Sequence, residues 1–462
     1  MILIDKYKFF PERMIFVPDS CSEDQLMRVF QFYSVLDDSA KNRELIYTHS
    51  ANNVPIRPEL LTHIGFSLSR NCNFRCQYCS ACSTEGFSDS VPMQDAMALV
   101  ADIMKRWTIA RLLGKEKSPR LEIYFTGGGE PTYEWEQFSQ LVLAIEEKAH
   151  NNQVPVQLGV TTNGVLSDEK IDFIAEHFAR IMISYDGLPE IQNRNRRSPH
   201  VENTSIPVER SIERLCEKQA PLTVRTTVWL EDFARMREMA DFLFGKFGCN
   251  FIWNILPVSP IGRGTGLYSN FAQEGNNDKY DFLQAYLDVL RYSQKHYSGC
   301  KIETQFFSAS PSHVYCGSLA HTAQCAWLTS NGDIVTCIEA DAFPTVIGHV
   351  NDGRVSYKAT CIDPLLKKTQ QMFDSCKECF AYPFCKGGCP AKAISRERAH
   401  MDEGIPWECE MTVKFWKRLL NEVLIGKEFF GWKTLASRYP DLNGIGVLEC
   451  VPAEVKKEDL LK

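Results

Sequence analysis

Residues 62–258 alternate six times between a short apolar segment and a segment with helical periodicity. Short runs rich in β-branched and aromatic residues predict strands, and apolar residues that recur with a helical period predict amphipathic helices. Repeated strand–helix units favour a parallel sheet that curls toward a barrel. We therefore predict an α/β fold with a partial (β/α)6 TIM-like barrel. The expected strands cover residues 64–69, 121–125, 156–160, 180–184, 222–229 and 250–258, and the expected helices between them cover 93–107, 135–150, 168–178, 208–219 and 233–247.

Polar or metal-ligating residues directly follow the first four predicted strands. In order, these residues are Cys72, Glu130, Asn163 and Asp186. The carboxyl ends of parallel barrel strands lie at one rim, and active sites of such barrels are built there. We therefore expect the four residues to lie near one another.

Three cysteines stand close together after the first strand, in the stretch NCNFRCQYCSAC at 71–82. Cys72, Cys76 and Cys79 have the spacing C-x3-C-x2-C. Thiolate is the soft ligand that iron–sulfur clusters use, and three thiolates would leave one iron of a 4Fe–4S cluster open to a small molecule. A zinc site and ordinary buried thiols are the alternatives, although zinc usually takes four ligands in two separated pairs. Cys82 is a nearby competitor for the same metal.

This motif, with the aromatic Tyr78 before its third cysteine, resembles the cluster motif of radical S-adenosylmethionine (radical SAM) enzymes. The resemblance implies that SAM chelates the open iron. It also implies that reduction cleaves SAM to methionine and a 5′-deoxyadenosyl radical, which abstracts hydrogen from a substrate. The cofactor would carry this chemistry, and the protein would supply orientation and exclusion of side reactions.

Three turns and one arginine resemble the SAM contacts of the same family. TGGGEPT at 126–132 resembles the motif that holds the SAM amino group, and the turns TTNG at 161–164 and SYDG at 184–187 match positions near the ribose and the carboxylate. An arginine after the SYDG turn could pair with the SAM carboxylate, although a solvated surface is the alternative. The resemblance implies cofactor contacts by Tyr78, Gly128, Gly129, Glu130, Thr162, Asn163, Ser184 and Arg196.

Eight of the 18 cysteines form a second group between residues 316 and 409, with SNGD at 330–333 as a hairpin turn inside it. A zinc ribbon is one interpretation. The full pattern, C-x9–15-G-x4-C, gap, C-x2-C-x5-C-x3-C, gap, C, resembles the SPASM domain of radical SAM peptide-modifying enzymes. The resemblance implies two auxiliary 4Fe–4S clusters, the first bound by Cys316, Cys325, Cys337 and Cys389, and the second by Cys376, Cys379, Cys385 and Cys409.

The chain is expected to have four parts. Residues 1–61 form a cap with two strands around Pro11 and Glu12 and a helix capped by Ser22, for which packing on the barrel is favoured over binding a leader peptide. The barrel covers 62–300, with a bridging helix at 277–298; the SPASM domain with its small β-hairpin and helices covers 301–425; and a tail covers 426–462.

Charge and hydropathy exclude several partners. The net charge of −7 gives no case for nucleic acid or an anionic membrane, and no run is long and apolar enough to span a bilayer. The first residues are charged throughout, unlike a signal peptide, so we expect a cytoplasmic protein.

We considered three functions. The first is a peptide maturase that installs a thioether or carbon–carbon crosslink in a ribosomally made precursor peptide, with a flavodoxin- or ferredoxin-type electron donor. The second is an anaerobic sulfatase-maturating enzyme that forms formylglycine. The third is a non-catalytic iron–sulfur electron carrier or sensor, which would not need the SAM-like turns.

The residue after the cysteine of the G-x4-C unit favours the first function over the second. Sulfatase maturases carry a carboxylate there, which is thought to take the substrate proton. Here the position is Ile338. If this segment is a strand, the nearby carboxylates Glu339 and Asp341 face its other side, whereas a loop at 338–341 would reopen the question. A general base must come within hydrogen-bond reach of its proton, so a shifted carboxylate is no simple replacement.

Overall fold

The computed structural model describes most of the chain between residues 63 and 358 and short pieces on either side. Backbone and side chains are described for 63–114, 119–267, 282–304, 326–335, 337–338, 346–358, 368, 371–372, 375–376, 379, 388–398 and 408–414, and the backbone alone for 2–4, 7–10, 15–18 and 325. The predicted helix after Ser22 lies outside these residues.

Six parallel strands form the centre of the largest sheet, and they confirm the predicted α/β fold with a partial barrel. Two of them, at 121–125 and 180–184, have the predicted bounds, and the others differ by a few residues at their ends. In chain order the strands are β4 (His63–Phe66), β6 (Leu121–Phe125), β7 (Val156–Thr162), β8 (Arg180–Ser184), β10 (Leu222–Val228) and β11 (Ile252–Pro257).

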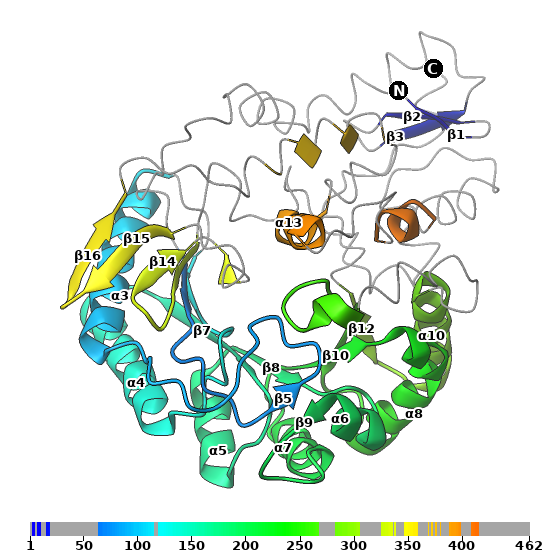
Figure 1. Ribbon diagram of the computed structural model, residues 1–462, viewed down its shortest axis with the longest axis horizontal. Coiled ribbons are helices and arrows are strands. Elements are labelled where there is room, and N and C mark those ends of the chain that lie inside the picture. The colour runs from blue at the N-terminus through cyan, green and yellow to red at the C-terminus, as the bar shows by residue number, and fades with distance from the viewer. Residues whose placement is uncertain are drawn as a thin grey trace.

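Helices cover the outer face of this curved sheet, so the sheet and helices form an open arc (Figure 1). They are α3 (Met93–Leu112), α4 (Trp135–Asn151), α5 (Asp168–His177), α7 (Ser205–Glu217), α8 (Met236–Phe247) and α10 (Phe282–His296). The predicted helix at 233–247 is divided, because residues 230–235 form a tighter 3-10 turn before α8.

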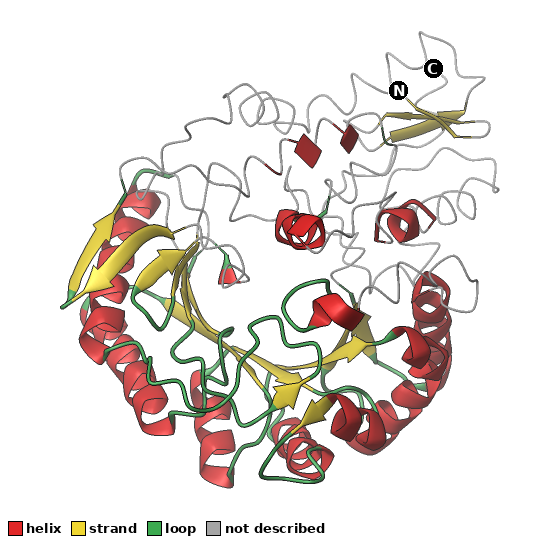
Figure 2. Ribbon diagram, viewed as in Figure 1, coloured by secondary structure: helices red, strands yellow, loops and turns green. Residues whose placement is uncertain are grey.

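Alternate strand residues explain why one face is covered and the other is not. In β6, Leu121, Ile123 and Phe125 are fully buried in the apolar core, while the residues between them are only half-buried. Side chains of a strand point alternately to its two faces, so the apolar set faces the helices and the polar set faces the inside of the arc. Figure 2 shows the helices on the outer side of these strands.

The sheet continues beyond both ends of the six strands. β12 (Lys301–Glu303) pairs with β11, and β13 (Cys325–Leu328) pairs in parallel with β4. Antiparallel strands β14 (Asp333–Val335), β15 (Val346–Asn351) and β16 (Arg354–Tyr357) follow, which confirms the predicted hairpin turn at SNGD. The sheet thus runs across residue 300, where we expect a domain boundary; the four-part division itself stays a prediction.

The β15–β16 hairpin is fastened to α3. The backbone N–H of Gly353 donates to Asp95 Oδ1 at 2.6 Å, and the Tyr357 hydroxyl donates to Asp102 Oδ2 at 2.7 Å. The Arg106 guanidinium lies 4.8 Å from the centre of the Tyr357 ring. These contacts join the end of the sheet to the helix that follows the cysteine loop.

A separate three-stranded antiparallel sheet lies at the N-terminus, made of β1 (Ile2–Ile4), β2 (Tyr7–Phe10) and β3 (Ile15–Pro18). The sequence predicts two strands here, but the first of them is divided into β1 and β2, which pair antiparallel. Among the described helices, none has the length and apolar character needed to cross a membrane.

Candidate active site

The loop that carries Cys72, Cys76 and Cys79 runs from β4 to α3 and is held at its centre by a two-stranded ladder. β5 (Arg75–Cys76) pairs antiparallel with β9 (Arg196–Arg197), and the Gln77 N–H donates to the Asn195 carbonyl at 2.9 Å. The loop after β8 therefore fixes the backbone around the second cysteine.

The three cysteines are partly buried free thiols with donors aimed at two of them. The Phe74 N–H lies 3.4 Å from Cys72 Sγ, and Arg196 Nη1 lies 4.0 Å from Cys76 Sγ. Burial raises the pKa of the Cys72 thiol to about 12 and that of Cys76 to about 11. N–H donors and a guanidinium are suitable neighbours for thiolates bound to an iron–sulfur cluster, since they offset the negative charge that burial disfavours.

No three ligating side chains of the described residues converge on a position for one metal ion. In a 4Fe–4S cluster each cysteine binds a different iron, so the sulfurs need not converge on one point. The three thiols on a single loop fit that requirement.

The glycine turn after β6 packs against the backbone of the cysteine loop. The Gly129 N–H donates to the Ser69 carbonyl and the Glu130 N–H to the Asn71 carbonyl, both at 2.8 Å. A Cβ on Gly129 would lie 1.9 Å from the Asn71 carbonyl oxygen, and Gly128 has a φ of +61°. Glycine is required here because the backbones of two loops meet at this turn.

The Glu130 carboxylate is buried and already accepts four hydrogen bonds. Oε1 accepts from the Thr132 N–H at 3.1 Å, from the Thr132 hydroxyl at 2.7 Å and from the Thr162 hydroxyl at 2.7 Å, and Oε2 accepts from the Asn163 N–H at 2.6 Å. Burial raises the pKa of Glu130 while these donors oppose the rise. The side chain therefore joins the ends of β6 and β7.

Asn163 extends this network to the cysteine loop. Its Nδ2 donates to Asn73 Oδ1 at 2.6 Å and lies 3.9 Å from Cys72 Sγ, while its Oδ1 accepts from the Val165 N–H at 3.1 Å. The turns after β6 and β7 thus meet the first cysteine, as the rim argument predicts.

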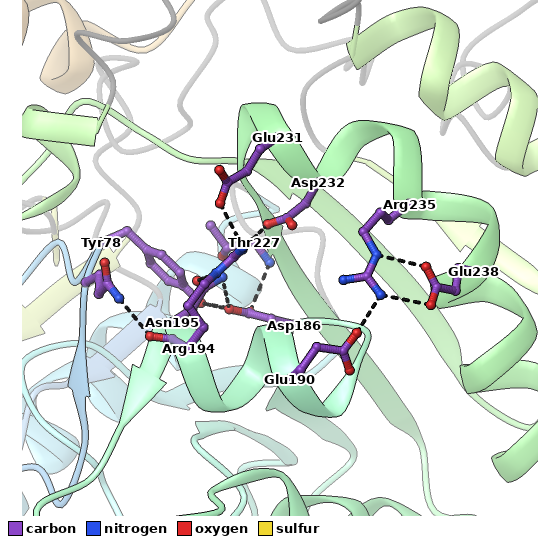
Figure 3. A network of polar contacts seen from close by, with 11 residues as sticks. Tyr78, Asp186, Glu190, Arg194, Asn195, Thr227, Glu231, Asp232, Arg235 and Glu238 are labelled. Atoms are coloured by element: carbon purple, nitrogen blue, oxygen red, sulfur yellow. Dashed lines mark hydrogen bonds and ion pairs between the residues drawn. The ribbon is translucent and has the colours of Figure 1, made fainter.

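Asp186, in the turn after β8, is the centre of a second buried network (Figure 3). It accepts from the Tyr78 hydroxyl at 2.6 and 2.8 Å, from Arg196 Nε at 3.0 Å and from Asn195 Nδ2 at 3.1 Å. The guanidinium of Arg196 also lies 5.2 Å from the Tyr78 ring centre. Burial alone would lower the pKa of Arg196, but the Asp186 charge raises it, so the arginine stays charged.

The remaining expected contacts are placed as follows. Ser184 is the last residue of β8, two positions before Asp186. Arg194 pairs instead with Glu231 at 2.7 Å and with Asp232, as Figure 3 shows. The structure therefore separates Arg196, which is buried beside the cysteine loop, from its neighbour Arg194, which belongs to a more exposed ion-pair group.

Two supporting residues make contacts at the site that the sequence does not indicate. Asp186 was noted at the rim, yet its role as the partner of Arg196 was not predicted, although the SYDG turn itself marked it. Arg263 was missed: its backbone N–H donates to the Cys79 carbonyl at 3.0 Å, and its Nη2 donates to the Ser83 carbonyl at 3.1 Å. The only signal was the glycine-rich segment after the last strand.

The later cysteines fall into two groups where they are described. Cys337 and Cys389 both pack against Ala391. Burial raises the pKa of the Cys409 thiol to about 11, and the neighbouring Cys376 and Cys379 add to the rise. Cys316 and Cys385 lie outside the described residues, and only the backbone of Cys325 is described.

Ile338 contacts the glycine turn from beyond the end of β14, which finishes at Val335, so it does not lie on the strand that we expected there. A Cβ on Gly127 would lie 2.1 Å from Ile338 Cγ1, so the isoleucine side chain covers this glycine. The residue after Cys337 therefore presents an apolar surface to the turn that precedes Glu130.

The fold and site thus combine an open α/β barrel with three free cysteines on the loop after its first parallel strand. Residues 66–243 match the family model described as Radical SAM superfamily. The chain thus carries a radical SAM domain and is an enzyme of that class, which sets aside the non-catalytic alternative.

Two curated relatives have the name cysteine-type anaerobic sulfatase-maturating enzyme, from two strains of Clostridium perfringens. They are 23% and 22% identical over 367 residues, which cover 76% of this chain and 95% of each relative. Crystal structures of Streptococcus suis SuiB are similar in fold at a TM-score of 0.50. The one bound to S-adenosylmethionine is 14% identical and covers 85% of this chain and 88% of its own. The one bound to precursor peptide SuiA is 15% identical and covers 78% of each.

Proposed function

We propose that this enzyme modifies a ribosomally made precursor peptide by installing a thioether or carbon–carbon crosslink. The observation that carries the proposal is the apolar contact of Ile338 with Gly127. That position would hold the proton-accepting carboxylate of a formylglycine-forming enzyme, and an isoleucine cannot accept a proton.

Cys72, Cys76 and Cys79 would hold the SAM-binding cluster. When bound, the cluster and SAM supply the hydrogen-abstracting radical of the reaction. The chain keeps the loop in place from two sides, through Asn163 and the glycine turn on one side and through the Asp186 network on the other. A loop fixed in this way pre-organises a reactive group and needs little reorganisation during the reaction.

Tyr78, Gly128, Gly129, Glu130, Thr162, Asn163, Ser184 and Arg196 remain our proposed SAM site, with the roles of two side chains refined. The Glu130 carboxylate is bonded to four protein donors, so its part is to position the turn whose backbone meets the SAM amino group. Arg196 donates from Nε to Asp186, and its Nη1 lies near Cys76 Sγ. We assign the remaining N–H groups of this guanidinium to the SAM carboxylate.

Two auxiliary 4Fe–4S clusters would be bound by the later cysteines, giving three clusters in all. The contact of Cys337 and Cys389 with Ala391, and the mutual influence of Cys376, Cys379 and Cys409, support the division into two ligand sets. Formation of a crosslink removes electrons from the peptide. Clusters that are fully ligated by cysteine could accept these electrons. A flavodoxin or ferredoxin would supply the reducing electron, and a cytoplasmic location suits such a donor.

Formylglycine formation is the second candidate, and the named relatives favour it. Their alignment covers nearly their whole length, although the identity is low. The missing carboxylate at position 338 is the specific argument against it. This argument does not extend to Glu339, because β14 ends at Val335 and strand alternation therefore does not decide where that side chain points.

The test is anaerobic incubation of reconstituted enzyme with SAM, reductant and one of two peptides, read by mass spectrometry. One peptide is the short precursor encoded beside the gene, and the other is a cysteine-containing sulfatase peptide. Loss of two hydrogens from the precursor, with a new linkage in the fragmentation pattern, supports crosslinking. Conversion of the sulfatase peptide to an aldehyde overturns it.

A further inference from the structure

The inner face of the sheet carries a row of polar side chains below the site. Trp253 and Ile255 of β11 are fully buried in the core, where Trp253 packs against Phe244 of α8. Because neighbouring residues of a strand point to opposite faces, Asn254 points to the inside of the arc. The helices of the barrel cover the other face (Figure 1).

Asn254 belongs to a row of polar residues that are in register across four consecutive strands of the sheet. It lies beside Arg225 of β10 and Glu303 of β12, and Arg225 lies beside Ser184 of β8. The row begins at a residue of the proposed SAM site and continues away from it across the sheet. The interior of a closed barrel is packed mainly with branched apolar side chains, so a polar row on an open barrel wall indicates a polar ligand.

Asn254 also has an unmet acceptor. Asn254 is 4% exposed, and its Oδ1 has no hydrogen-bond partner among the described residues. Buried polar atoms are ordinarily hydrogen-bonded, and an acceptor buried without a donor destabilises the folded protein. Such an atom on a binding wall suggests that the donor belongs to a ligand.

We propose that Asn254 is a substrate-binding residue whose Oδ1 accepts a hydrogen bond from a backbone N–H of the bound peptide. This inference rests on the proposed function, because a peptide offers an amide N–H at every residue except proline. The half-buried Ile252 and Leu256 flank Asn254 on the same face of β11 and provide apolar contact. Arg225 and Glu303 add one charge of each sign beside it.

The test is Asn254→Leu, which removes the acceptor and keeps a similar shape. Removal of an unmet acceptor is expected to raise the midpoint of thermal unfolding of the cluster-loaded enzyme by about 1–3 °C. The KM for the peptide that the parent modifies is expected to rise roughly tenfold, because the peptide N–H loses its partner. SAM affinity and SAM cleavage without peptide are expected to stay at the parent's level.

Ser293→Ala is the matched control. Ser293 Oγ is also buried and has no partner in the part of the chain that the structure describes, but it lies in α10 on the outer layer. Its removal should leave the KM for the peptide unchanged.

Four results would overturn the inference. A lower unfolding midpoint for Asn254→Leu would mean that the protein itself satisfies the oxygen. An unchanged KM in Asn254→Leu would mean that the peptide does not bind Asn254. A loss of SAM affinity in the same variant would mean that Asn254 Oδ1 accepts from the adenine amino group of SAM. If the parent enzyme modifies neither peptide, both the proposed function and the role of a peptide N–H at Asn254 are wrong. If the parent enzyme modifies a peptide and Asn254→Leu has the same KM, only the inference about Asn254 is wrong.

Discussion

Two buried carboxylates hold the cysteine loop from opposite sides, and they do so by different means. Glu130 follows β6 and accepts from two hydroxyls and two backbone N–H groups, all of them uncharged. Asp186 follows β8 and accepts from the charged Arg196 as well as from Tyr78 and Asn195. Both carboxylates are at most 5% exposed.

The difference indicates a division of roles. A buried carboxylate with uncharged hydrogen-bond donors fixes the geometry of the surrounding backbone. Burial raises the pKa of Glu130, and its hydrogen bonds from Thr162, Asn163 and Thr132 oppose that rise. Asp186 balances Arg196 and so keeps a guanidinium charged inside the protein. Glu130 therefore fixes the backbone on one side of the cysteine loop. On the other side, Asp186 holds Arg196, the cation that we propose binds the SAM carboxylate.

Asp186→Ala should have the largest effect on stability. It leaves the guanidinium of Arg196 buried without a counter-charge, for which we expect a loss of about 3–5 kcal/mol in the free energy of unfolding. Urea unfolding under anaerobic conditions measures it. Glu217→Ala is the control, because the exposed pair of Arg214 and Glu217 should contribute less than about 1 kcal/mol. Similar losses for both variants would contradict the charge-balance role.

Glu130→Gln should have an intermediate effect. The substitution replaces one acceptor oxygen by an NH2 group, which cannot accept and faces a protein donor. We expect this to lower the free energy of unfolding by about 1–3 kcal/mol. SAM binding should weaken because the glycine turn shifts, and iron content should stay at the parent's level. Equilibrium binding of SAM and urea unfolding provide the measurements. A variant with weaker SAM binding and the parent's stability would instead favour direct contact of the carboxylate with the SAM ammonium.

Tyr78→Phe should have the smallest effect of the three. It removes a single hydroxyl donor from Asp186, while Arg196 and Asn195 continue to bind that carboxylate. We expect a loss of about 0.5–1.5 kcal/mol in unfolding free energy, and SAM affinity lowered by less than tenfold. A larger loss of SAM affinity would give Tyr78 a direct part in binding.

The auxiliary region offers a separate test by metal content. If eleven cysteines hold three four-iron clusters, the anaerobically reconstituted protein should contain about 12 irons and a similar amount of sulfide. Elemental analysis measures both. Zinc bound at Cys376–Cys409 in anaerobically prepared protein would contradict the auxiliary clusters.

Local patterns predicted the barrel well because strand and helix periods are local properties of the chain. The bounds of β6 and β8 follow from short apolar runs between polar turns, and the rim position of Asn163 and Asp186 follows from strand direction. The parallel pairing of β13 with β4 could not be predicted, because those strands are more than 250 residues apart and no local period encodes their contact.

The sequence proposes residues for the site, but it does not indicate the contacts between them. Motif spacing identified Glu130 and Arg196, yet their partners, Thr162 and Asp186, are set by how turns after different strands meet. The same limit applies to Gly129, whose tight contact with Asn71 depends on two loops that the sequence alone does not bring together.

Formation of 5′-deoxyadenosine tests the central claim most directly. The parent enzyme and a variant with Cys72, Cys76 and Cys79 all changed to Ala are reconstituted anaerobically and supplied with SAM and reductant. Our account predicts 5′-deoxyadenosine from the parent and none from the variant, which should retain about two thirds of the parent's iron. Equal 5′-deoxyadenosine from both proteins would contradict the assignment of the SAM-binding cluster to this loop.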